Sequence, residues 1–291
     1  MSCNNHLLAR RKLDGSMEIL SRDKWSILQA EHYFGKSNVF LLPCGKCSGC
    51  LIAKRKEYAV RCAMEAKEYQ VSSFVTLTYD DEHNPGYLRK RDLSYFVKKI
   101  RNKGYKVRYF GCGEYGGQTA RPHYHIILFG FMPDDIKFFA KSPSGVSLFR
   151  SQMLENVWNK GFVSVQSFDP YAAGYVAGYT TKKLGKNDGF LLMSRKPGLG
   201  RAYMERNCSK ILDTDFIVDD FGSIKKVKAP RYFDKIAEQL HLDFSVSRAK
   251  RAEIVEQANA GEMFANGLGR ESLLLRNKLI DDERIKKKRL L

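Results

Sequence analysis

The sequence of 291 residues lacks the long apolar run that a membrane-spanning helix needs. No stretch of about 18 apolar residues occurs, and the first residues, MSCNNHLLARRKLDG, lack the apolar segment of a secretory signal peptide. The chain also lacks internal repeats and a phosphate-binding loop of the form GxxxxGK[ST]. We therefore expect no membrane span, no secretion signal and no ATPase within this sequence.

Acidic residues are scarce relative to basic ones. Asp and Glu total 32, Lys and Arg total 50, and the formal net charge is +18. Because this excess is spread along the chain, we expect a polyanionic partner, with nucleic acid the leading candidate. Seven cysteines are an odd number, and a chain that is 43% hydrophobic can bury a core without disulfides. We therefore expect a reducing cytoplasm.

Hydrophobic periodicity predicts strands at 72–79, 106–115, 122–130 and 162–168. Helices are predicted at 51–68, from Asp92 to Gly104, at 148–160, and from Asp169 to Leu184. This order indicates an α+β fold with a largely antiparallel sheet. We divide the chain into an N-terminal segment (1–70), a core (71–230) and a basic helical extension (231–291).

Two histidines in the run RPHYHIILFG are candidate metal ligands. His123 and His125 project from the same face of a strand, because side chains two residues apart do so. A hairpin with GGQTAR at its tip would place Glu114 of the preceding strand beside them. Two imidazoles and a carboxylate form a three-ligand site with open positions, which is typical of catalysis. The alternative is that ordinary hydrogen bonds satisfy the histidines.

Tyrosines recur at every fourth residue in DPYAAGYVAGYTTKKLG, so Tyr171, Tyr175 and Tyr179 share one helix face. Lys182 and Lys183 follow within one turn. A tyrosine oxygen can act as a covalent nucleophile, but its ordinary pKa of about 10 requires a nearby positive charge. Core packing is the alternative, and it is favoured for Tyr171 at the helix start.

Three cysteines form the run Cys44-x-x-Cys47-x-x-Cys50, which can supply thiolates to Zn²⁺ or to an iron–sulfur cluster. Both usually take four ligands, and the spacing does not identify the fourth. The alternative is a set of small buried cysteines. Candidates for the missing ligand are Cys3, Cys62, Cys112 and a histidine.

Several charged residues are candidates for DNA contact. Arg121 lies next to the histidines and can meet a phosphate. Arg195 and Lys196, in the loop RKPGLGR, can contact backbone phosphates; a solvated surface loop is the alternative. Asp80 and Asp81 follow the first core strand, where they can support the metal site through hydrogen bonds or simply be solvated.

Together, three ordered motifs resemble those of replication initiators in the HUH endonuclease superfamily. They are FVTLTYDD (74–81), GEYGGQTARPHYHIILFG (113–130) and YVAGYTTKK (175–183). The resemblance covers roughly residues 42–205 and points in particular to the initiators of small single-stranded DNA phages, the microviruses, especially the gokushovirus branch. Supporting stretches are LPCGKCSGC (42–50), TLTYDDEHNP (76–85) and MSRKPGLG (193–200). One departure is Gly178, where related two-tyrosine enzymes often carry a basic residue.

The resemblance implies an RRM-like core with a central antiparallel sheet of about five strands flanked by helices, and helical N- and C-terminal extensions. It implies that Glu114, His123 and His125 bind Mg²⁺ or Mn²⁺, and that Tyr175 or Tyr179 attacks single-stranded origin DNA. The products would be a 5′-phosphotyrosine link and a free 3′-hydroxyl, with Lys182 or Lys183 supplying positive charge. The second tyrosine would later allow the ends to be rejoined in rolling-circle replication.

The implied partners are a host helicase and a host DNA polymerase in the cytoplasm of the bacterial host; the oligomeric state stays open. A plasmid relaxase or a single-strand transposase would share the same chemistry. A non-enzymatic, zinc-containing nucleic-acid-binding protein is the alternative from another class. In that case the tyrosines belong to the core and the histidines are only hydrogen-bonded.

Overall fold

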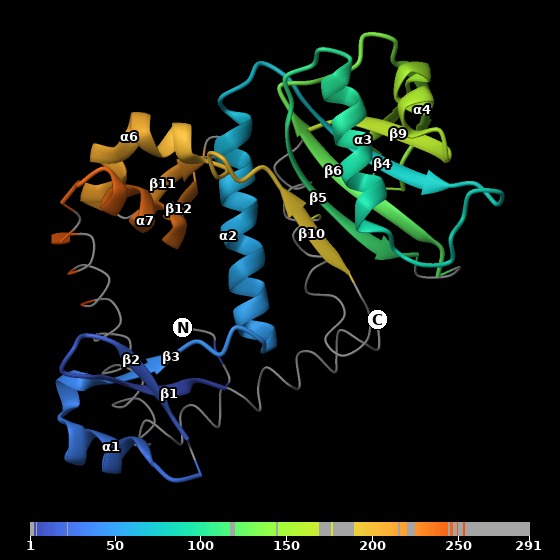
Figure 1. The fold of residues 1–291 in the computed structure, drawn as a ribbon. Coiled ribbons are helices and arrows are strands. Elements are labelled where there is room, and N and C mark those ends of the chain that lie inside the picture. Colours follow the sequence, from blue (N-terminus) through green and yellow to red (C-terminus); the bar gives the residue numbers. More distant parts are fainter. Residues whose placement is uncertain are drawn as a thin grey trace. The chain divides into compact units, whose positions relative to one another are not determined.

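The computed structural model describes residues 3, 5–21, 23–116, 120–143, 145–168, 176, 189–214, 216–219, 225–243, 245, 246, 249 and 253. The chain divides into a smaller unit, which includes Met1–Ala53, and a larger unit, Lys54–Ala252. The division falls inside helix α2 (Ser48–Ala66) (Figure 1). It differs from the predicted boundaries at residues 70 and 230. In the part of the chain that is described, no helix is long and apolar enough to cross a membrane.

The smaller unit contains a three-stranded antiparallel sheet in the order β2-β1-β3. Its strands are β1 (Leu7–Arg11), β2 (Met17–Leu20) and β3 (Val39–Leu42), and α1 (Ile27–Phe34) and the short 3₁₀ turn η1 (Lys36–Asn38) precede β3. Ser26 and Gln29 form a capping box at the start of α1. The weak periodicity of residues 1–43 does not predict this sheet, because its strands are only four or five residues long.

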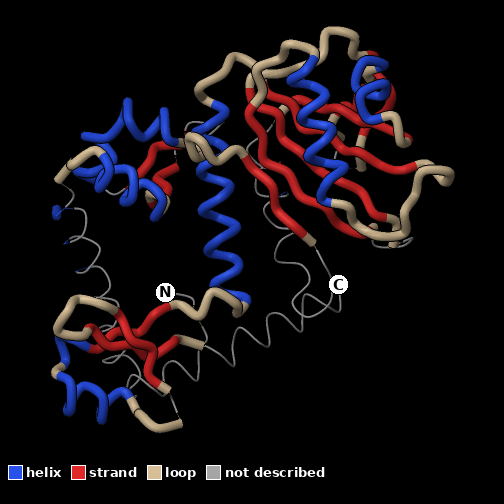
Figure 2. Tube along the Cα trace, in the orientation of Figure 1, coloured by secondary structure: helices blue, strands red, loops and turns tan. Residues whose placement is uncertain are grey.

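The larger unit is built on a seven-stranded sheet in the order β10-β5-β6-β4-β9-β8-β7, with all pairings antiparallel. The expected α+β class and antiparallel sheet are confirmed, with more strands than the five expected. The strands run side by side in Figure 2. Their bounds are β4 (Ser72–Tyr79), β5 (Arg108–Tyr115), β6 (Pro122–Phe129), β7 (Lys137–Lys141), β8 (Ser147–Arg150), β9 (Gly161–Ser167) and β10 (Phe190–Met193).

Two helices, α3 (Lys90–Asn102) and α4 (Gln152–Trp158), cover one face of this sheet (Figure 1). The prediction of a helix over 148–160 is wrong at its start, since β8 occupies 147–150 and Ser151 caps α4. The predicted cap at Asp92 is also wrong. Arg89 is the N-cap of α3, and Asp92 is a buried residue in the first turn, where its carboxylate accepts a hydrogen bond from the Tyr79 hydroxyl.

The opposite face of the sheet packs against the C-terminal half of α2. Phe74, Phe110 and Ile127 form a buried cluster with Cys62 and Ala66 of that helix. On its other side, α2 packs against α6 (Arg201–Thr214) and α7 (Arg231–Gln239), which follow the sheet in the chain. Residues predicted as the start of a separate C-terminal extension therefore pack within the larger unit. A hairpin of β11 (Phe216–Asp219) and β12 (Lys225–Lys228) lies between α6 and α7 in the sequence.

Candidate metal centre

The register of β5 and β6 brings Glu114, His123 and His125 together. Glu114 pairs directly with His123, and the next position on the same face pairs Cys112 with His125. One oxygen of Glu114, Oε1, lies 2.8 Å from Nε2 of His123 and 3.1 Å from Nε2 of His125. The structure thus gives the three predicted ligands one convergence point, with all ligand atoms within 4.8 Å of one another.

Each imidazole is oriented through its outer nitrogen. Nδ1 of His123 lies 3.1 Å from the carbonyl oxygen of Arg121, and Nδ1 of His125 lies 3.0 Å from Oγ1 of Thr76 on β4. The ring of Phe74 stacks on His125 with a centroid distance of 5.6 Å. Both Nε2 atoms therefore turn toward Glu114, as outer hydrogen bonds do for metal-binding histidines.

The hydrogen bonding of His123 tests whether a metal fits. A carbonyl oxygen can only accept, so Nδ1 of His123 carries the proton, and the Nε2 of the neutral ring presents a lone pair. That lone pair points at a carboxylate oxygen only 2.8 Å away. Two lone pairs at this distance repel unless a proton or a cation lies between them. The donor set therefore fits a divalent cation.

Electrostatics keep the carboxylate of Glu114 charged. Partial burial acts to raise the pKa of Glu114, but hydrogen bonds from His123 and His125 outweigh it and lower the pKa to about 2. Burial raises the pKa of the neighbouring Cys112 thiol, and the charge of Glu114 raises it further. Cys112 therefore remains a protonated thiol, which is a poor metal ligand.

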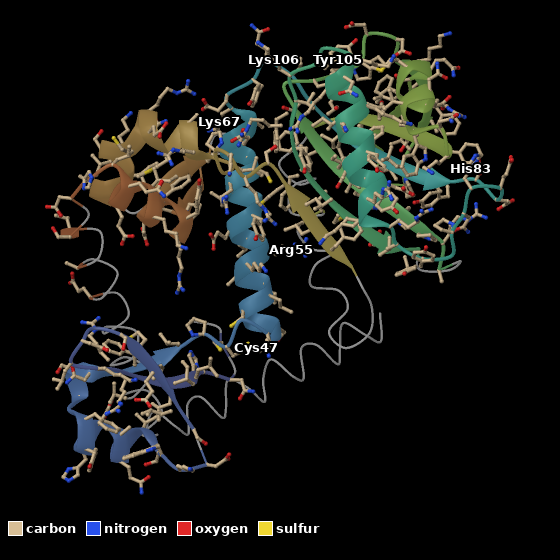
Figure 3. The ribbon with its side chains drawn as sticks, viewed as in Figure 1. Cys47, Arg55, Lys67, His83, Tyr105 and Lys106 are labelled. Atoms are coloured by element: carbon tan, nitrogen blue, oxygen red, sulfur yellow. The ribbon has the colours of Figure 1, made fainter. Side chains whose placement is uncertain are left out.

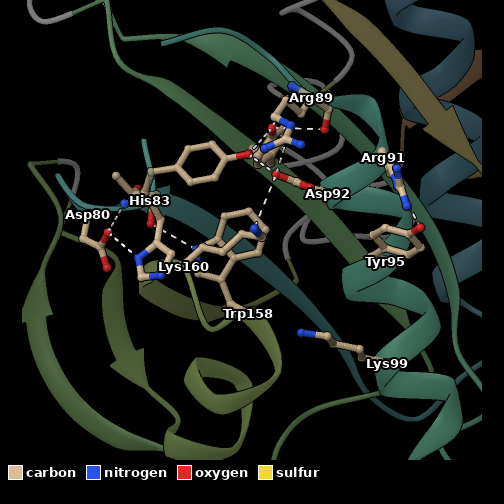
Figure 4. Close-up of polar contacts among 12 residues, drawn as sticks. Asp80, His83, Arg89, Arg91, Asp92, Tyr95, Lys99, Trp158 and Lys160 are labelled. Carbon is tan, nitrogen blue, oxygen red and sulfur yellow. Dashed lines mark hydrogen bonds and ion pairs between the residues drawn. The ribbon is translucent and has the colours of Figure 1, made fainter. Parts of the chain in front are cut away.

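A buried tyrosine anchors the histidine strand from the other face. Tyr124 lies between the two histidines and points to the core under α3. Its hydroxyl accepts from the Arg89 N–H at 3.0 Å and lies 2.7 Å from the hydroxyl of Tyr79, which donates to Asp92 at 2.6 Å. Figure 4 shows the surroundings of Asp92. The sequence reasoning missed this network; the phenol enclosed by the His-x-His pair was the available signal.

The basic residues expected near DNA occupy different surroundings. The Arg121 guanidinium forms an ion pair with Asp81 and donates to the carbonyl oxygen of Tyr79 at 3.1 Å. Arg195 and Lys196 are exposed in the loop after β10. Asp80 accepts from the ring of His83 at 2.8 Å. The phosphate contacts of these basic residues stay predictions.

The predicted tyrosine segment lies almost wholly outside the described residues. Tyr171, Tyr175, Tyr179, Lys182 and Lys183 are all outside them, and between 168 and 189 only residue 176 is described. That residue, Val176, is fully buried in the cluster that contains Phe74, on the histidine side of the sheet.

The predicted cysteine ligands separate into two groups. Cys44, Cys47 and Cys50 lie together where α2 begins, with Cys3 beside them; Figure 3 labels Cys47 at this end of the helix. Cys62 and Cys112, which the sequence left as alternatives for the fourth ligand, are instead buried in the cluster under the sheet.

Comparison with known proteins identifies relatives over most of the chain. The family model of the replication-associated protein ORF2 matches residues 72–184. The chain is 31% identical over 265 residues to replication-associated protein ORF2 of Spiroplasma virus 4, covering 81% of this chain and 82% of the relative. It is 30% identical to replication-associated protein VP4 of Bdellovibrio phage phiMH2K over 69% of each chain. It is 30% identical to replication-associated protein ORF4 of Chlamydia phage 1 over 69% of this chain and 54% of the relative. No solved structure matches.

Proposed function

Because the chain belongs to the replication-associated protein ORF2 family, we propose that it initiates phage replication by nicking single-stranded origin DNA. A tyrosine attacks the DNA, and the ends are rejoined later. The observation that carries this proposal is the convergence of two imidazole Nε2 atoms on one carboxylate oxygen. Three protein ligands leave coordination positions open for a phosphate oxygen and water, as in catalytic metal sites.

Glu114, His123 and His125 would hold Mg²⁺ or Mn²⁺; imidazole ligands suit Mn²⁺ better. When bound, the cation supplies Lewis acidity to the scissile phosphate. The chain's own residues set the geometry. The Arg121 carbonyl and the Thr76 hydroxyl fix the ring orientations, and the low pKa of Glu114 keeps a negative charge on the site at neutral pH.

The nucleophile in this proposal is Tyr175 or Tyr179. The phenol loses its proton, its oxygen forms a bond to phosphorus, and the bond from phosphorus to the 3′-oxygen breaks. That oxygen takes up a proton and leaves as the 3′-hydroxyl, while the 5′-phosphate stays on the tyrosine. The ammonium group of Lys182 or Lys183 favours the phenolate. Support comes from Val176, which lies in the cluster next to the ring that stacks on His125.

An exposed aromatic residue on the same face of the sheet offers a stacking surface for a base. Thr78 of β4 pairs with His123 on one side and with Phe162 of β9 on the other. Phe162 therefore shares the histidine face, two strands or about 10 Å away, and is 55% exposed. The Arg150 guanidinium lies 5.8 Å from its ring. Exposed aromatic rings with nearby cations bind single strands without sequence preference.

A covalent adduct tests the proposal. The full-length chain is incubated with circular single-stranded phage genome and Mn²⁺, digested with nuclease, and run on a denaturing gel. We expect a protein–DNA adduct that is lost with EDTA and in the double variant Tyr175→Phe, Tyr179→Phe. Binding in a native gel with no adduct under any metal condition would instead identify a non-enzymatic DNA-binding protein.

A further inference from the structure

We propose that Cys3, Cys44, Cys47 and Cys50 form a structural zinc site in the smaller unit. The four Sγ atoms lie within 4.8 Å of one another. Two of the separations are 3.8 Å, between Cys47 and Cys3, and 3.9 Å, between Cys44 and Cys50. None of the four forms a disulfide. This inference does not depend on the nicking chemistry.

These distances match one tetrahedral ion. Zinc–thiolate bonds of about 2.3 Å place the corners of a tetrahedron about 3.8 Å apart. A disulfide would instead bring two sulfur atoms to about 2.05 Å. An iron–sulfur cluster needs a wider arrangement, because its cysteines bind different iron atoms. Four thiolates complete a zinc coordination shell, so the site is closed, as in structural zinc sites.

The backbone supports negative charge on the sulfur atoms. The N–H of Cys44 donates to Sγ of Cys3, and the N–H of Cys47 donates to Sγ of Cys44, both at 3.3 Å. Gly45 has a φ of +74°, which glycine adopts without strain and which tightens the turn between Cys44 and Cys47. Cys50 lies in the first turn of α2, where the helix dipole favours a thiolate.

The position of the site explains what a zinc ion would do. Strands β1 and β3 are adjacent, and Leu7 pairs with Leu42 at the end of the pair. Cys3 precedes that end of β1, and Cys44 follows that end of β3, so the ion would join the two segments where the ladder stops. Among the described residues, the apolar cluster of this unit is small, with four buried members, Leu8, Leu20, Ile27 and Ala30. Units this small commonly require a metal or disulfides for stability.

Metal content of the full-length chain tests the site. The protein is expressed with added zinc and purified without chelator, and bound metals are measured by mass spectrometry. We expect one zinc per chain in the wild type, in His123→Ala and in Cys208→Ser, whose cysteine lies on α6 outside the cluster. Cys3→Ser and Cys47→Ser should each weaken zinc binding by more than about tenfold, since losing even an outer partner of a metal ligand costs about 10–100-fold.

Two further measurements keep the test decisive if a cysteine variant fails to fold. Metal-free wild type titrated with Co²⁺ should show the visible bands and the sulfur-to-cobalt charge-transfer band of tetrahedral thiolate coordination, saturating at one equivalent. Hydrogen exchange of β1 and β3 should rise when zinc is removed, while that of β4–β6 stays constant. Zinc retained in Cys3→Ser, zinc lost in His123→Ala, or a cobalt spectrum without thiolate bands would overturn the proposal.

Discussion

The two candidate metal centres differ in how the chain assembles them. Glu114, His123 and His125 come from two adjacent strands of one hairpin, and their geometry follows from strand register. The cysteine cluster joins Cys3 to residues about forty positions later in the chain. The first offers three mixed ligands and remains open, whereas the second offers four thiolates and is closed. Ligand number and type thus separate a site suited to reaction from one suited to holding a fold.

Removing one histidine should break this comparison most sharply. We expect His123→Ala to lower DNA cleavage by at least about a hundredfold, since metal-ion stabilisation is worth several kcal/mol, and to leave zinc content and salt-dependent DNA binding unchanged. Cleavage assays and metal analysis of the same sample measure this. His83→Ala is the matched control, because His83 is a half-exposed histidine paired with Asp80. Parallel loss of cleavage and DNA binding would contradict the assignment.

The surface around the open site provides the next test. Phe162→Ala should weaken single-stranded DNA binding by about 1–3 kcal/mol, the value of one base–aromatic stack. Fluorescence anisotropy with a labelled oligonucleotide measures the change. Tyr95→Ala, which removes an exposed aromatic residue from α3 on the other face, should bind as the wild type does. Equal losses in both variants would show that the effect is not specific to the histidine face.

Support for the open site from the core can be removed separately. Tyr124→Phe deletes the hydroxyl that contacts Arg89 and Tyr79, and buried groups left without a partner cost about 1–3 kcal/mol. We expect that loss in the free energy of unfolding, with a smaller fall in Mn²⁺ affinity and no change in zinc content. Chemical denaturation and calorimetry measure these quantities. Unchanged stability would show that the network does not hold the strand.

A carboxylate outside both clusters gives the reference for pH effects. Burial acts to raise the pKa of Asp135, but hydrogen bonds from Ser151 and the Met153 N–H outweigh it and lower the pKa. Its stabilising effect is therefore present above its unfolded pKa of about 3.9 and disappears as pH falls through the folded value. Asp135→Asn should cost about 0.5–1 kcal/mol at pH 7 and less at pH 3, as measured by urea unfolding. A cost that grows toward acid pH would refute this.

Strand periodicity and hairpin geometry are local, so the sequence predicted the four long strands and the proximity of Glu114 to the histidines. The edge strands β7, β8 and β10 escaped prediction because they have four or five residues and are only partly buried. Cys3 could not be chosen over Cys62 or Cys112, because the pairing of β1 with β3 decides the matter. The cap at Arg89 was missed because its side chain makes no capping hydrogen bond.

The alternation of β6 has a consequence for how this strand can change. Its odd positions near the start carry the imidazoles, and Tyr124 between them is fixed in the opposite layer. Substitutions alter one layer at a time, but inserting or deleting a single residue between His123 and His125 would exchange the layers. One imidazole would then enter the apolar core while a core side chain took its place beside Glu114. Length, more than identity, is therefore the invariant property of this segment.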